Sequence, residues 1–183
     1  MMDIFHEFIV KKKKDTTDIL LTVGIIFAAI VLTFVLLFVT MAVNMQMQGV
    51  GGIGFVLIFL MWWGAKNLIS SRNIEYEYIL TNSELDIDKI IGRRGRKRLL
   101  TVNFREIERC ASIRDEKYSY EYNNPGSRSV KNYAGDTDAE RVYFVDFTKD
   151  SEPMRVIFQP NERILEGIKK VNPRCVEIKE GDV

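Results

Sequence analysis

The feature that most constrains this chain is the absence of any charged residue over residues 19–65, in a sequence of which 28% is charged. A polar interruption around Gln46 divides this stretch into two apolar segments, 19–43 and 50–69. Each is close to the roughly 20 residues that a helix needs to cross about 30 Å of hydrocarbon. The sequence therefore predicts a two-helix transmembrane hairpin and not a signal peptide, whose apolar region is only about 7 to 15 residues long.

Positive charge flanks the two apolar segments on one side only, because it precedes the first, follows the second and is absent from the link. Lysine and arginine are enriched in cytoplasmic flanks, so we expect a multi-pass protein of the plasma membrane with both termini in the cytoplasm. Two adjacent tryptophans fit the aromatic belt at a membrane interface. The predicted interface residues are Lys11, Lys12, Lys13, Lys14, Trp62, Trp63 and Lys66.

Small residues occur in both apolar segments, where helices can approach closely only through small side chains. Gly24 and Ala28 form a small-xxx-small pair, and Gly51, Gly52 and Gly54 lie at the start of the second segment. We expect these residues to pack the two helices of one hairpin; a homo-oligomer built through them is the alternative. The stretch 19–65 contains no ionisable residue, which argues against a transporter or channel.

Outside the hairpin, the sequence predicts a cytoplasmic N-terminal tail over residues 1–18 and one soluble domain over residues 74–178. Ile74–Thr81 and Glu84–Ile91 alternate apolar and polar residues around a two-residue turn, which indicates a β-hairpin. With Thr81 opposite Glu84, Leu80, Tyr78 and Tyr76 lie opposite Leu85, Ile87 and Lys89. We therefore expect Ile87 and Val102 to face the core, and Asp86 and Asp88 to face water.

The rest of the soluble region predicts further short strands and one helix. Pairing Ile91 with Arg98 continues the apolar face into a third strand. Tyr118, Tyr120 and Tyr122 alternate in a polar connection and suggest an edge strand. This pattern predicts an α+β fold with an antiparallel sheet and a C-terminal helix. The expected segments are strands 98–104, 109–113, 141–148 and 154–159, a connection over 114–139, and an amphipathic helix from Asn161 to Val171.

Two stretches carry a resemblance to a known family. YILTNSELDIDKIIGRRGRKRLLTVNFREIERC resembles the opening of a bacterial pleckstrin-homology-like (PH-like) domain, and RVIFQPNERILEGIKK resembles its close. With the preceding apolar segments, the layout is also similar to small two-span bacterial membrane proteins of an uncharacterised family. The resemblance implies a seven-strand split barrel or sandwich capped by a C-terminal helix, and it implies no particular ligand.

The sequence offers no catalytic constellation. The only histidine, His6, precedes the first apolar segment, and no nucleophile, metal or phosphate-loop motif is present. Cys110 and Cys175 lack the spacing of a zinc site or a disulfide framework, so we expect both to be reduced. Acidic residues on strand 84–91 have the chemistry to hold a hard cation, but a solvated outer face is the favoured interpretation. We expect no enzymatic activity, no cofactor and no metal.

The densest charge cluster lies at the predicted loop 92–98. Glycines open this loop and arginines can bind phosphate bidentately, so a lipid headgroup or another anion is the candidate ligand. The other interpretation is a solvated loop neutralised by the acidic strand face. Nucleic acid is disfavoured, because no aromatic stacking platform accompanies the cations. The candidate residues are Arg93, Arg94, Arg96, Lys97 and Arg98.

Two functions are compatible with these features. The first is a membrane-anchored, non-catalytic adaptor that presents its soluble domain to a protein partner. The second is a module that senses anionic lipid through loop 92–98, with Arg93, Arg94 and Arg96 facing the cytoplasmic leaflet. We favour the adaptor, because a protein already integral to the bilayer gains little further localisation from an additional lipid contact.

Overall fold

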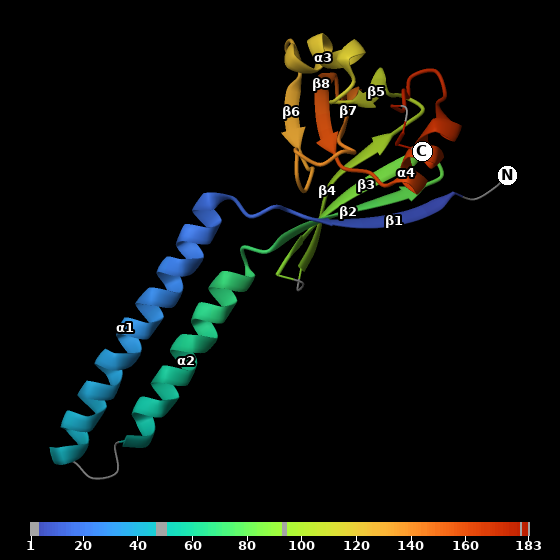
Figure 1. The fold of residues 1–183 in the computed structure, drawn as a ribbon. Helices are drawn as coiled ribbons and strands as arrows, with labels where there is room; N and C mark the ends of the chain where they lie inside the picture. The colour runs from blue at the N-terminus through green and yellow to red at the C-terminus, as the bar shows by residue number, and fades with distance from the viewer. Residues whose placement is uncertain (1–3, 47–50, 93–94, 180, 183) are drawn as a thin grey trace. The chain divides into compact units, whose positions relative to one another are not determined.

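The computed structural model describes residues 4–46, 51–92, 95–179 and 181–182. The chain forms two compact units, one made by Lys14–Asn73 and the other by the chain on either side of that segment (Figure 1). Each unit is built from its own contacts and is described separately below.

The first unit is a pair of apolar helices, α1 (Thr16–Gln46) and α2 (Gly51–Ser70). Both are long and apolar enough to cross a membrane, and their most apolar windows are only 6% and 11% buried. A core helix of a soluble protein would be mostly covered by protein, which these helices are not. Asp15 starts α1 by accepting a hydrogen bond from the backbone N–H of Thr16 at 2.8 Å. The predicted apolar hairpin is thus present as two packed helices.

The second unit contains two four-stranded sheets, with strand orders β1-β2-β3-β4 and β5-β7-β8-β6. All neighbouring strands are antiparallel except β6 and β8. The C-terminal helix α4 places Ile164, Leu165 and Ile168 in the main apolar core. The elements are β1 (Phe5–Lys11), β2 (Ile74–Thr81), β3 (Glu84–Ile91), β4 (Gly95–Asn103), β5 (Arg109–Ser112), α3 (Glu116–Asn123), β6 (Ser129–Asn132), β7 (Tyr143–Lys149), β8 (Glu152–Phe158) and α4 (Glu162–Val171).

The prediction of a separate N-terminal tail over residues 1–18 is wrong. β1 pairs with β2 along its whole length, from Phe5 opposite Thr81 to Lys11 opposite Glu75 (Figure 1). Its side chains alternate between exposed and covered, and Val10 is buried in the main core. With β1, the described chain has eight strands, one more than the seven that the family resemblance implies. It also makes the helical hairpin an insertion between two neighbouring strands of one sheet.

The predicted strand registers are partly correct. The pairing of β2 with β3 is confirmed, with Tyr78 opposite Ile87. The pairing of β3 with β4 differs from the prediction. The difference is two residues at Leu100, which lies opposite Ile87 and not Lys89, and three residues at Arg98, which lies opposite Asp88 and not Ile91. A shift of two residues keeps side chains on the same face of a sheet. Ile87 and Val102 are accordingly both 0% exposed, as predicted.

The connection 114–139 is more ordered than predicted. Its alternating tyrosines do not form an edge strand but lie in the helix α3, which begins after the N-cap residue Asp115. Buried Arg155 holds this segment: its guanidinium pairs with Asp146 through a 2.6 Å hydrogen bond and donates to the backbone carbonyls of Glu121 and Tyr122. A buried arginine needs such a full set of partners, and α3 supplies two of them.

Replacing Val10 with Asp should lower the free energy of unfolding of the second unit by about 3 kcal/mol, because it buries a carboxylate among apolar side chains. Val10 is 8% exposed, whereas its neighbour Ile9 is 45% exposed and serves as the matched position. The control Ile9→Asp should cost less than about 1 kcal/mol. Pulse proteolysis of the full chain in detergent across a urea series measures both. Equal costs would contradict the placement of β1 against the core.

Candidate interaction surfaces

The outer face of the β1-β2-β3-β4 sheet carries a network of opposite charges. Arg96 Nη2 lies 2.7 Å from Glu77 Oε1, and Arg98 lies 2.9 Å from Asp86 and 3.4 Å from Asp88. The predicted solvated acidic face is therefore wrong at two positions, because Glu77 is 0% and Asp88 only 4% exposed. Long arginine side chains from β4 reach across the face and cover the acids of β2 and β3.

A β-bulge explains why these arginines meet the acids. The register shifts between Ile87 and Asp88, where Leu100 and Arg98 are the successive partners and Leu99 is the extra residue. The extra residue of a bulge moves the side chains beyond it to the opposite face of the sheet. Arg98 and Arg96 thereby fall on the acidic face, whereas an unbroken register would have directed Arg98 towards the core.

The predicted basic loop is thus only partly a loop. Arg96, Lys97 and Arg98 belong to β4, and two of these three cations are already paired with carboxylates. Lys97 is exposed and has no ion pair in the described chain. Arg93 and Arg94 lie outside the described residues. Of the five candidate anion ligands, Lys97 is the described residue that keeps its charge available.

Glu77 is the least solvated acid of this face. Its Oε2 atom is buried without a hydrogen-bond partner in the described structure. Burial, together with the neighbouring carboxyl of Glu7, raises the pKa of Glu77, and the positive charge of Arg96 offsets only part of this effect. The face therefore holds a carboxyl group that favours its neutral form more than an exposed glutamate does.

The predicted membrane-interface residues have different surroundings. Lys13 belongs to the second unit, where its Nζ lies 3.0 Å from Asp136 and its backbone N–H donates to the carbonyl of Gly135. Lys11, Lys12, Lys14 and Lys66 are exposed, as are the two tryptophans. In the helical unit, Trp62 Nε1 donates to Thr33 Oγ1 at 3.1 Å and so links α2 to α1. Their position at a membrane interface stays a prediction.

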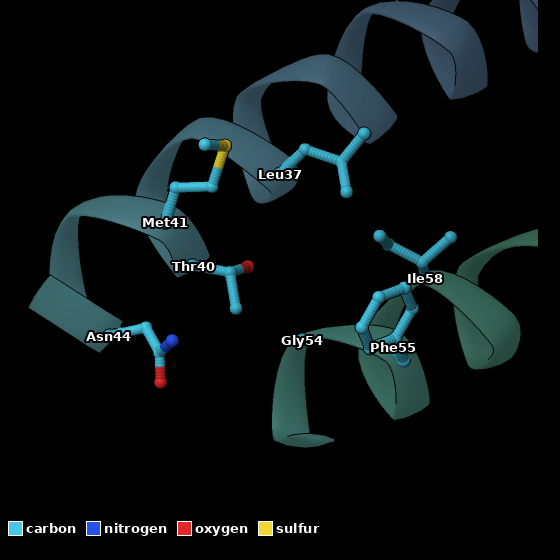
Figure 2. A pocket seen from close by; sticks show the side chains of 7 residues that line it. All are labelled: Leu37, Thr40, Met41, Asn44, Gly54, Phe55 and Ile58. Carbon is cyan, nitrogen blue, oxygen red and sulfur yellow. The ribbon is translucent and has the colours of Figure 1, made fainter. Parts of the chain in front are cut away.

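The small residues of the two helices do not all serve hairpin packing. Gly54 is tightly packed, because a Cβ atom there would overlap Thr40, and Figure 2 shows Thr40 directed at it. Gly24, in contrast, has open space around it, and Ala28 is exposed. The expectation that Gly24 and Ala28 pack the two helices of one hairpin is therefore wrong. A homo-oligomer in which this pair contacts a second copy of the chain stays a prediction.

A cavity of about 160 Å³ lies between α1 and α2 near their connected ends (Figure 2). Leu37, Met41, Phe55 and Ile58 make most of its wall apolar, and Asn44 contributes a carboxamide at the end of α1. Such a wall suits hydrocarbon, but nothing in the described structure distinguishes a particular occupant from bulk lipid tails.

A second, more polar cavity of about 350 Å³ lies in the second unit, which contains the two sheets. It is lined by residues 5–7 of β1, by Arg141 before β7 and by residues 161–163 at the start of α4. Sequence reasoning missed this site because it assigned His6 to a tail outside the domain. The apolar run of Phe8, Ile9 and Val10, two of them β-branched, was the local signal of a strand, although Ile9 interrupts the apolar–polar alternation. Among the described residues, no group of three or more His, Cys, Asp or Glu side chains is placed to hold a metal ion.

Two sheets followed by a C-terminal helix, with an apolar helical hairpin between the first two strands, define a PH-like protein that carries a hairpin insertion. Residues 2–178 match the family described as Bacterial PH-like domain (DUF6106), and the chain belongs to this family. The matched range includes β1 and both apolar helices. No curated protein and no solved structure matches the chain.

We expect Glu77→Gln to stabilise the second unit at neutral pH and to reduce the pH dependence of its free energy of unfolding. Because the folded-state pKa of Glu77 is raised above 4.5, its contribution to stability is fully present below that pH and is lost as the pH rises through the folded-state pKa. Glutamine keeps a neutral side chain at every pH. Urea unfolding of the full chain at several pH values measures the effect, with exposed Glu84→Gln as the control. A variant less stable than the parent at neutral pH would contradict this account.

Proposed function

We propose that this protein is an integral membrane adaptor whose PH-like domain, on the cytoplasmic side, binds a protein partner without catalysing a reaction. The observation that carries the proposal is the pairing of β1 with β2 across the helical hairpin. Both ends of the hairpin lead into one domain, so a hairpin that crosses the bilayer twice keeps that domain on a single side. The lysines at 11–14 and Lys66 favour the cytoplasm as that side.

The charge arrangement favours a protein partner over an anionic lipid. A lipid sensor needs arginines whose charge is free, but Arg96 and Arg98 are engaged with Glu77, Asp86 and Asp88. Neutralised arginines contribute little to the attraction of roughly 1 kcal/mol per basic residue that draws polybasic segments to anionic membranes. The alternative, an anionic-lipid sensor that uses residues 92–98, would therefore have to rely on Arg93, Arg94 and Lys97.

The topology is tested by cysteine accessibility in a Cys175→Ser background, where the remaining Cys110 is buried. Gln46→Cys should react with a membrane-impermeant maleimide in intact cells, because the link lies outside. Ile9→Cys and Lys170→Cys should react only after the cells are opened, because β1 and α4 belong to one cytoplasmic domain. Labelling of the last two positions in intact cells would show that the domain lies outside the cell and would contradict the proposed orientation. Labelling of one of them but not the other would contradict the placement of β1 and α4 in a single domain.

The adaptor role is tested with the full chain in nanodiscs made with and without anionic lipid. We expect a stoichiometric protein partner, cross-linked in cells and identified, to rebind equally in both, because its affinity does not depend on lipid charge. A fluorophore on Lys97→Cys should show the same emission in both. A lipid-dependent change at position 97 without a stoichiometric partner would support the sensor instead.

A further inference from the structure

The outer edge of β1 has unused backbone hydrogen-bonding groups. Ile4 and Lys12 bond to the β2 side through Asn82 and Ile74, which places the even-numbered residues of β1 in the hydrogen-bonded pairs. The N–H and C=O groups of the odd-numbered residues therefore point away from β2. β1 ends the strand order of its sheet, and among the described residues the backbones of residues 5, 7 and 9 have no other partner.

The neighbouring structure leaves this edge open along only part of its length. Near the C-terminal end of β1, Gly135 passes so close to the carbonyl of Lys11 that a Cβ atom would overlap it. At the N-terminal end, residues 5–7 instead line the polar cavity of about 350 Å³. Residues 5–7 thus belong both to the open edge and to the cavity, whose other lining residues are Arg141 and the start of α4. The open edge and this cavity together are called the groove below.

The groove offers charges of both signs. Arg163 has no ion pair in the described chain, and the carboxylate nearest to Arg141 is Asp182, at 3.9 Å. Glu7 and Glu162 line the same cavity and would repel a simple anion. A polypeptide carries N–H donors for these carboxylates and acceptors for the arginines, and an extended one also matches the strand edge.

We propose that this groove binds an extended segment of the protein partner, which adds a strand to the open edge of β1 and directs an acidic side chain towards Arg141 and Arg163. The inference rests on the proposed adaptor function and names the surface and the chemistry of its partner. It leaves the apolar face of the helical hairpin and the arginines of β4 uninvolved.

The test tethers a defined probe to the full chain in neutral-lipid nanodiscs. A peptide of alternating valine and threonine with one central glutamate is fused to the N-terminus through a Gly/Ser linker, which raises its effective concentration to the millimolar range. Hydrogen exchange at single-residue resolution should slow about tenfold or more at the amides of Phe5, Glu7 and Ile9. The amides of His6, Phe8 and Val10, already bonded to β2, should change little.

Two matched variants separate strand addition from charge recognition. Changing the glutamate of the probe to glutamine, or Arg163→Gln in the protein, should reduce the added protection several-fold, while Lys170→Gln on the same helix should not. No added protection with the glutamate probe would overturn the proposal. So would protection in the untethered protein that rises with its concentration, which indicates a second copy, or protection that requires anionic lipid. The nanodisc experiment with the cellular partner does not depend on this probe, so the two proposals can fail separately.

Discussion

The pairing of β1 with β2 is the constraint on which the rest of the molecule depends. These strands are neighbours in the sheet but are separated in sequence by the whole helical hairpin. β1 and β2 can therefore pair only if the two ends of the hairpin lie close together. Removing the residues before the hairpin would not trim a tail; it would remove an edge strand and uncover part of the core around Tyr78 and Leu80, which are both 0% exposed.

Hairpin packing also makes that pairing less costly. Closing a flexible loop as long as this insertion costs entropy that grows with the logarithm of its length. Here the two helices are joined along their length, by the Gly54 and Thr40 contact near one end and by Arg72 and Asp18, 3.4 Å apart, near the other. Only a few residues separate each helix from its strand. The packed hairpin therefore acts as a short connection between β1 and β2, and less entropy is lost when these strands pair.

The sequence predicted the faces of the sheet better than its edges. The alternation of side chains along each strand predicted that Ile87 and Val102 lie in the core, and it fixed the β2 to β3 register. A slip by one residue would move every apolar side chain of a strand to the opposite face. The bulge at Leu99 could not be predicted this way, since it changes parity midway along β4. β1 was missed because its partner lies beyond the hairpin and the lysine run beside it reads as a membrane flank. Nonlocal pairing of this kind leaves only a weak local pattern.

The same nonlocality changes the meaning of the basic cluster. Read along the chain, residues 93–98 are a dense positive segment; in the sheet, Arg96 and Arg98 lie beside acids contributed by β2 and β3. A charge paired within its own sheet has little left for a ligand, so the densest charge cluster does not by itself mark the binding surface. Unused hydrogen-bonding capacity is the better guide. The open edge of β1 is one of the sheet edges of the described chain with such capacity, and strand addition there would satisfy backbone groups that the fold leaves to solvent.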